Sequence, residues 1–292
     1  MKVIFSNDDF GLTYGFTKGI SDCFLNGVTT SASICINGHA YKYALKLLKT
    51  KLKNLTIGLH LNLDYGNTGT KELQNKKGKY KFTFLKYYIL IKLSKKILVN
   101  IESDLEFQFK KAISDNLKIT FVNGHDHIYM IPEIFVLVCK LCKKYRIKYI
   151  RLPREPYYLT GNLKQDLGII FSPNIIKFLL LNNFCKTNYK TINEYSLKTT
   201  DAFYGVLYTQ RMNISTVISA IKSAQSHNYK SIEILGHPSN LNDPRDKIYE
   251  TNVYEQFAKS EARKVEKKLF QSNYLKKFLK EKEILLRPFN NL

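Results

Sequence analysis

The sequence predicts an α/β fold in which a (β/α) barrel-like parallel sheet forms one domain. Its 292 residues, 44 % apolar and 24 % charged, have the composition of a globular chain with a sizeable core. Short apolar runs alternate with helical patterns along most of the chain, which indicates a parallel sheet. Six or seven such units, with no repeat and no Pro/Ser-rich linker between them, favour a single barrel-like domain over residues 1–292.

The expected strands and helices follow one another in alternation. Apolar runs predict strands at Lys2–Ser6, Ser31–Ile36, Thr56–Leu61, Ile119–Val122, Ile147–Arg151, Ser231–Leu235 and Glu283–Leu286. Helical spacing predicts helices near Tyr14–Asn26, His39–Thr50, Glu102–Asn116, Pro132–Tyr145, Ile214–Ser226 and Tyr254–Phe270.

Two long segments interrupt this alternation. Residues 65–97 are rich in lysine and glycine, and we interpret them as an insertion or lid over one end of the barrel, with a solvated surface elaboration as the alternative. Residues 153–200 are rich in tyrosine and asparagine, and we expect an irregular lid or substrate wall there.

The chain is strongly basic, with 46 Lys+Arg against 24 Asp+Glu and a net charge of +22. Lysine accounts for 39 of the basic residues, asparagine and tyrosine are abundant, and tryptophan is absent. This bias is typical of an AT-rich coding sequence. Because nucleic-acid binders cluster their basic residues and these lysines are spread along the whole chain, we expect no specific nucleic-acid partner.

We expect the protein to be cytoplasmic. Met1-Lys2 is followed by a short apolar run and then by acidic residues, too early for a secretory signal. The longest apolar stretches fall short of the roughly 20 residues of a transmembrane segment. Five cysteines are an odd number that suits reduced thiols, and we interpret Cys139-x-x-Cys142 as packing residues.

Polar residues follow the predicted strands at the point where each strand ends. Because barrel enzymes assemble their active sites at the C-terminal ends of the strands, this pattern predicts a catalytic site there. The residues concerned are Asp8 and Asp9, His60, His125 and His127, Arg151, and His237.

Each of these residues also has a structural alternative. Asp8 and Asp9 could cap the next helix, although two adjacent carboxylates on a strand point to opposite sides and so suit two roles. His60, inside an apolar strand, could be a satisfied core histidine. In an extended segment His125 and His127 would face the same side, a common metal-ligand spacing. The sequence His237-Pro238 could simply form a loop.

Together these residue types support metal-assisted hydrolysis. One Asp and two His can bind a divalent cation, which lowers the pKa of a bound water and polarises a carbonyl. A second carboxylate can accept a proton, a histidine can donate one to the leaving group, and an arginine can hold the carboxylate or the substrate. The sequence contains no serine-hydrolase elbow, P-loop or dinucleotide fingerprint.

Several ordered motifs resemble those of the YdjC-like carbohydrate deacetylases, the family of chito-oligosaccharide deacetylase and the hopanoid-associated proteins. The motifs are Asn7-Asp8-Asp9-Phe10-Gly11-Leu12, residues 27–33 with Asn37-Gly38, residues 58–63, residues 124–132, residues 151–155 and residues 233–238. The resemblance covers the whole chain. It implies a barrel-like fold related to polysaccharide deacetylases and hydrolysis of the linear amide bond of an N-acetylated sugar.

The resemblance also implies roles for individual residues. Asp9, His60 and His125 would be the metal ligands, Asp8 the general base, Arg151 the residue that orients this base, and His237 the general acid. The family implies Mg²⁺, whereas two imidazoles suit Zn²⁺ or another transition metal at least as well. Asn123, Asp126 and Tyr129 differ from the residues usual in the family, and neither they nor His127 receive a role.

The expected partner is therefore an acetylated sugar or glycan. Two alternatives remain open: a barrel metallohydrolase of another amide or ester, and a non-catalytic basic protein that binds glycans or polyanions on the same scaffold. A homodimer is one option for the assembly.

Overall fold

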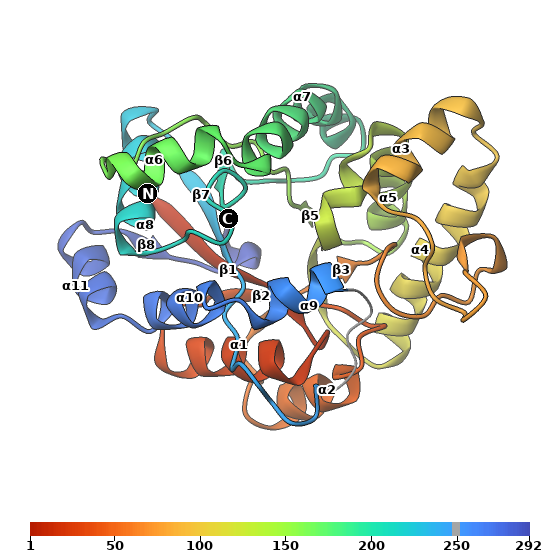
Figure 1. Cartoon of the computed structure of the whole chain (residues 1–292), viewed down its shortest axis with the longest axis horizontal. Helices are drawn as coiled ribbons and strands as arrows, with labels where there is room; N and C mark the ends of the chain where they lie inside the picture. The colour runs from red at the N-terminus through yellow and green to blue at the C-terminus, as the bar shows by residue number, and fades with distance from the viewer. Residues whose placement is uncertain (247–251) are drawn as a thin grey trace.

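A curled sheet of parallel strands surrounded by helices forms the centre of the computed structural model, which describes residues 1–246 and 252–292 (Figure 1). The strands are hydrogen-bonded in the order β5-β4-β3-β2-β1-β7-β6, and β8 pairs with β1. Their bounds are β1 Lys2–Phe10, β2 Ser31–Ile34, β3 Thr56–Leu61, β4 Ile119–Gly124, β5 Tyr149–Ile150, β6 Ala202–Tyr204, β7 Ser231–Gly236 and β8 Leu285–Leu286. The predicted barrel-like parallel α/β fold is confirmed.

Helices connect the strands and cover the outside of the sheet (Figure 1). They are α1 Tyr14–Asn26, α2 Tyr41–Thr50, α3 Phe84–Leu93, α4 Ile97–Ser114, α5 Pro132–Lys144, α6 Leu163–Ile170, α7 Pro173–Glu194, α8 Ile214–Ser226, α9 Asn252–Lys259, α10 Ala262–Phe270 and α11 Asn273–Glu281, with short 3₁₀ helices η1 Lys71–Leu73, η2 His125–Met130 and η3 Phe289–Asn291. Within the described ranges, no single helix has the length and apolar composition to cross a membrane; α6 and α7 pass that test only as a pair, which is bent by 68°.

The sheet curls far enough for its two edge strands to be joined by backbone hydrogen bonds. Lys198, in the segment that leads into β6, accepts from the amide of Ile150 and donates to the carbonyl of Lys148. The amide of Phe203 in β6 donates to the carbonyl of Arg154, just after β5. The concave face of the sheet is therefore an enclosed interior, and side chains that point into it are shielded from water.

The side chains in this interior form an apolar layer and, above it along the strands, a polar layer. At the N-terminal end of the strands, Ile4, Phe121, Tyr149 and Phe289 form a separate apolar cluster, and the rings of Phe121 and Phe289 stack with centroids 3.9 Å apart. Since side chains alternate along a strand, the residues two positions after those of the apolar cluster also point inward and form the next layer. There Ser6, Asn123 and Arg151 are fully buried, and the functional residues described below surround them.

Several elements differ from the sequence prediction. The segment expected to be irregular between Pro153 and Thr200 contains α6 and the 22-residue α7. Pro173, which interrupts the apolar run, lies in the first turn of α7, where proline costs no hydrogen bond. The predicted helix Tyr254–Phe270 is two helices, α9 and α10, and the short β6 was not predicted.

The segment 65–97 is folded against the rest of the protein. Its side chains Leu73, Tyr80 and Tyr87 are buried in the main core, and the hydroxyl of Tyr80 donates to the carboxylate of Asp104 on α4. The segment contains α3, which the sequence did not predict as a helix. A lid function for these residues remains a prediction.

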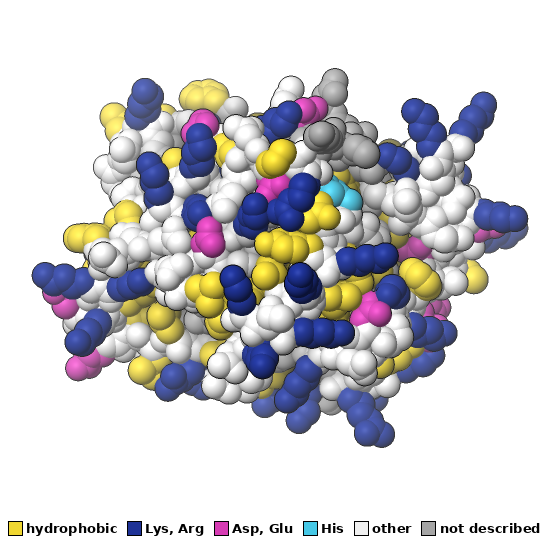
Figure 2. All heavy atoms as spheres, turned by 90° about the horizontal axis from the view of Figure 1, so that it is seen from below, with side chains coloured by type: hydrophobic (Ala, Val, Ile, Leu, Met, Phe, Trp, Pro, Cys, Tyr) yellow, Lys and Arg dark blue, Asp and Glu magenta, His cyan; other side chains and the backbone are white. Residues whose placement is uncertain are grey.

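The basic residues are dispersed over the surface. Figure 2 shows lysine and arginine side chains scattered across one whole face, with fewer acidic side chains between them. This distribution agrees with the spread of lysine along the sequence.

The stacked pair Phe121–Phe289 supplies the first testable prediction. Phe289 is fully buried, so Phe289→Ala should leave a cavity inside the sheet and lower the free energy of unfolding by about 3–5 kcal/mol. Urea denaturation measures this change, and Leu285→Ala, at a half-exposed position on β8, is the control. A loss for Phe289→Ala no larger than that of the control would show that the C-terminal segment does not stabilise the interior.

Candidate metal centre and active site

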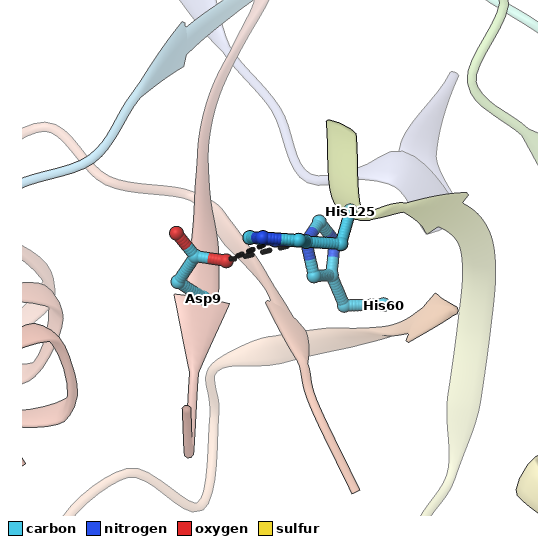
Figure 3. Close-up of side chains that lie close together, drawn as sticks. All are labelled: Asp9, His60 and His125. Carbon is cyan, nitrogen blue, oxygen red and sulfur yellow. Dashed lines mark hydrogen bonds and ion pairs between the residues drawn. The ribbon is translucent and has the colours of Figure 1, made fainter. Parts of the chain in front are cut away.

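Three predicted ligands meet at the C-terminal end of the sheet (Figure 3). Asp9 lies near the end of β1, His60 in β3, and His125 directly after β4. Asp9 Oδ1 lies 3.3 Å from His60 Nε2 and 3.1 Å from His125 Nδ1. The structure thus brings the three predicted ligands together, and their role as metal ligands remains a prediction.

The geometry of the three side chains fits a divalent cation. Ligand atoms bound to one ion at about 2.0–2.2 Å lie about 3–3.4 Å apart, which matches both distances from Asp9. His60 Nε2 is buried and has no hydrogen-bond partner among the described residues. A buried nitrogen without a partner is costly, and a cation between it and Asp9 would remove that cost.

Hydrogen bonds on the other side of His60 fix the role of this nitrogen. His60 Nδ1 lies 2.9 Å from the amide oxygen of Asn123, whose amide nitrogen donates to Asp8. An amide oxygen can only accept, so Nδ1 carries the hydrogen and the lone pair of a neutral His60 is on Nε2. That lone pair faces a carboxylate oxygen of Asp9, an arrangement that a metal ion stabilises and that Asn123 orients from behind.

The backbone at Asp9 corrects one expectation. Asp9 has φ +70°, a left-handed conformation that is uncommon for a residue with a side chain. This turn breaks the alternation of the strand, so that Asp8 and Asp9 both reach the surroundings of His60 and do not point to opposite sides. The capping alternative is also wrong, because the hydroxyl of Thr13 caps α1 by accepting from the amide of Phe16.

The expectation for His125 and His127 is wrong as well. The chain is not extended here but enters η2, where Asp126 and His127 have φ of 47° and 57°. His127 therefore turns away from the three ligands, and its ring contacts those of Tyr129 and Phe203. Burial lowers the pKa of His127 well below its usual value, which keeps this residue neutral.

Arg151 is fully buried and joins two carboxylates. Its guanidinium donates to both oxygens of Asp8, at 2.5 and 2.9 Å, and to Oε1 of Glu233, at 2.6 and 2.9 Å. Ser33 and Asn123 also donate to Asp8. Every oxygen of Asp8 thus has a donor, whereas Asp9 faces the two histidines, which separates the two adjacent acids into different environments.

The pKa directions follow from this arrangement. Burial alone would raise the pKa of Asp8, but the positive charge and hydrogen bonds of Arg151 outweigh it and hold that pKa far below the usual value. Glu233 differs, because the effect of burial is larger than that of Arg151 and the pKa of Glu233 is raised. Burial would lower the pKa of His125, but the carboxylates of Asp64 and Asp9 raise it to about 10. The site therefore has a negative potential that attracts a cation.

His237 lies at the same end of the sheet, outside the group of three ligands. The pairing of Asn7 with Gly236 places it beside the end of β1. Its amide donates to the carboxylate of Glu266, and its ring contacts Phe257 on α9 with centroids 5.3 Å apart. Burial lowers the pKa of His237, although Glu266, Asp9 and Asp8 oppose this shift.

The sequence analysis did not predict the residues whose hydrogen bonds position the predicted site residues. Glu233 is the acid of an otherwise apolar strand, Ser-Ile-Glu-Ile-Leu, and that position was the available indication of an inward polar role. Ser33 and Asn123 occupy inward positions of β2 and β4, and their residue types alone did not indicate contacts with Asp8 or His60. A second acidic group formed by Asp64, Asp126 and the shared His125 lies nearer the surface.

Aromatic rings border the site. The rings of Tyr65 and Tyr254 lie 4.4 Å apart, and each also contacts His125, with centroids 6.3 and 5.9 Å away. Tyr254 belongs to α9, so this helix and the start of the segment 65–97 form one wall beside the candidate metal centre.

Comparisons with known proteins identify the family of the chain. The family model described as YdjC-like protein matches residues 2–281. The chain is 23 % identical to a carbohydrate deacetylase of Brevibacillus brevis over the full length of both proteins. It is 27 % identical to a carbohydrate deacetylase of Clostridium beijerinckii, over 64 % of this chain and 76 % of that protein. A protein of that name from Vibrio cholerae is 30 % identical over 50 % of this chain and 57 % of its own.

A solved structure supports the same fold. A protein of Enterococcus faecalis, provisionally described as a cellobiose-phosphate cleavage protein, superposes with a TM-score of 0.72 and 17 % identity. The match covers 99 % of this chain and 98 % of that one. With the family model matching almost its whole length, the chain belongs to the YdjC-like protein family.

Proposed function

We propose that this chain is a metal-dependent carbohydrate deacetylase that removes an N-acetyl group from an amino sugar or glycan. The observation that carries the proposal is the arrangement of Asp9, His60 and His125 beside an Asp8 that Arg151 holds. Metal ligands next to a separate carboxylate can together catalyse the hydrolysis of an amide. The relatives named carbohydrate deacetylase indicate which amide is cleaved.

The proposed metal ligands are Asp9, His60 and His125. When bound, a divalent cation would supply Lewis acidity at the acetyl carbonyl and lower the pKa of a water molecule. Two imidazoles and one carboxylate favour Zn²⁺ or another transition metal by ligand softness, and the family resemblance implies Mg²⁺.

Asp8 is proposed as the general base. Its strongly lowered pKa makes it a weak base for ordinary water, and a bound cation would supply a more acidic water from which Asp8 could accept the proton. Arg151 is the positioning residue, because its two hydrogen bonds set the carboxylate plane of Asp8 and keep its oxygens from replacing those of Asp9 as ligands.

His237 is proposed as the general acid. When an amide is hydrolysed, the amine is a poor leaving group unless its nitrogen gains a proton as the C–N bond breaks. Burial makes the protonated form of His237 a stronger acid than an ordinary histidine, while Glu266 lies 3.9 Å from its Nδ1.

The proposal also retains the remaining expectations. These are one domain over residues 1–292, a cytoplasmic location and a homodimer as one option for the assembly. The five cysteines are buried and free, which suits a reducing compartment.

The metal assignment predicts the behaviour of two histidine variants. Wild-type protein should bind one equivalent of Zn²⁺ or Mn²⁺ in isothermal titration calorimetry, and His60→Ala should lose this binding together with the activity. His227→Ala, at an exposed position outside the site, should keep both. Stoichiometric metal in a folded His60→Ala protein would contradict the assignment.

The role of Asp8 predicts a rate effect with intact metal binding. Asp8→Asn should lower kcat by about 10²–10⁴-fold, the usual contribution of general base catalysis, while one equivalent of metal remains bound. Steady-state kinetics on an N-acetylated chito-oligosaccharide, with metal analysis of the same sample, measure both effects. An unchanged kcat would leave Asp8 as a partner of Arg151 without a role in proton transfer.

The role of His237 predicts a difference between two substrates. His237→Ala should slow deacetylation of an N-acetyl sugar far more than hydrolysis of an activated acetate ester, whose leaving group needs no proton. Metal content should not change. Equal losses on the two substrates would exclude the general-acid role.

A further inference from the structure

One corner of the molecule exposes a cluster of apolar side chains that no part of the described structure covers. The α6–α7 corner, residues 163–179, comprises α6, the turn after it and the start of α7. It contains six of the 20 large apolar residues that are exposed among the described residues: Leu163, Leu167, Ile170, Phe171, Ile176 and Leu179. Phe171, at the turn itself, is 88 % exposed, and Leu163 is 74 % exposed.

The spacing of these residues produces two apolar helix faces. Leu163, Leu167 and Ile170 are four and three residues apart and therefore lie on one side of α6, while Asp166 and Ile169 face the core. Ile176 and Leu179 lie one turn apart on α7, opposite the buried Phe178. The helices meet at 68°, so the corner projects with Phe171 at its apex.

Exposed lysines lie within this apolar corner and further along the same helices. Lys164 lies on α6, and Lys186 and Lys190 lie further along α7. α3 packs beside α7 through the stacked rings of Phe84 and Phe184, and Figure 1 shows α6, α7 and α3 along one edge of the molecule. α3 adds exposed leucines and lysines of its own, at positions 85, 86, 92 and 93.

An apolar corner with lysines nearby fits one class of partner best. In a dimer through this corner, two copies that each carry a net charge of +22 would be brought together, which electrostatic repulsion opposes. A bilayer with anionic headgroups accepts both features, because apolar side chains enter the interface while lysines bind the negatively charged headgroups. Exposed apolar patches of this kind are typical of interaction sites.

We propose that the α6–α7 corner docks the protein on an anionic lipid bilayer. Phe171 and its apolar neighbours enter the interface, and the nearby lysines contact the headgroups. Docking would bring the candidate metal centre near the membrane surface, since Lys177 on α7 lies 3.4 Å from Asp126, the residue after His125. The proposal does not depend on the deacetylase activity.

The absence of tryptophan from the sequence makes a direct measurement possible. Phe171→Trp places a single tryptophan at the apex, and its emission should shift to shorter wavelength with vesicles of phosphatidylglycerol and phosphatidylcholine. Tyr274→Trp, at a 62 % exposed position on α11, is the matched control and should not shift. No shift for Phe171→Trp, or an equal shift for both variants, would overturn the proposal.

Co-sedimentation with the same vesicles separates apolar docking from general attraction by the net charge of +22. The variant L163E/F171E should bind at least about tenfold less than wild type, because a charge in the interface opposes insertion. The control L25E/Y274E makes the same charge change at exposed apolar positions of α1 and α11 and should bind like wild type. Equal losses in both variants would show attraction by charge alone and would overturn the proposal.

The alternative partner for the α6–α7 corner is a second copy of the chain. Sedimentation velocity without lipid should give the same oligomeric state for wild type and L163E/F171E. If wild type is instead a dimer that L163E/F171E dissociates, and the dimer does not bind vesicles, the corner is a subunit interface and the membrane proposal is wrong. Thermal unfolding of each variant checks that the fold is retained.

Discussion

The structure depends on a group of buried charges inside the curled sheet. Asp8, Asp9 and Glu233 are nearly or fully buried, and the fully buried Arg151 pairs with two of them. The carboxyl groups of Asp8, Asp9 and Glu233 share one guanidinium in a region shielded from water, and this shortage of positive charge is unfavourable. A divalent cation at Asp9, His60 and His125 would restore the balance. The raised pKa of Glu233 has the same origin, because burial beside other acids favours its neutral form.

This constraint explains how two adjacent acids come to lie in different environments. Arg151 and its neighbours saturate Asp8 with hydrogen-bond donors, and the left-handed turn at Asp9 directs the second carboxylate toward the histidines. The apolar layer beneath, with Phe289 inserted from the C-terminal segment, excludes water from that side of the group. The electrostatic interactions are therefore made in surroundings of low polarity, where they are stronger than in water.

The sequence was sufficient to predict the parallel barrel-like sheet and the end of it at which the polar residues gather, because strand alternation and strand ends follow from local patterns. It was insufficient where backbone conformation departs from the regular element. The left-handed conformations of Asp9 and His127 changed the expected directions of their side chains. Glu233 acts through Arg151, a partner 82 residues away in the sequence, and no local pattern reveals such a contact. The segment of α7 was read as irregular because its apolar and asparagine residues lack a clear helical period.

We infer that the buried group of charges is arranged around a divalent metal ion at Asp9, His60 and His125. Anomalous diffraction from a crystal soaked in Zn²⁺ or Mn²⁺ tests this claim most directly, because it locates the ion independently of activity. We expect one strong peak within about 2.0–2.3 Å of a carboxylate oxygen of Asp9 and a nitrogen of each histidine, with Asp8 still bound to Arg151. A peak confined to the outer acidic group of Asp64 and Asp126, or coordination by Asp8 in place of Asp9, would contradict it.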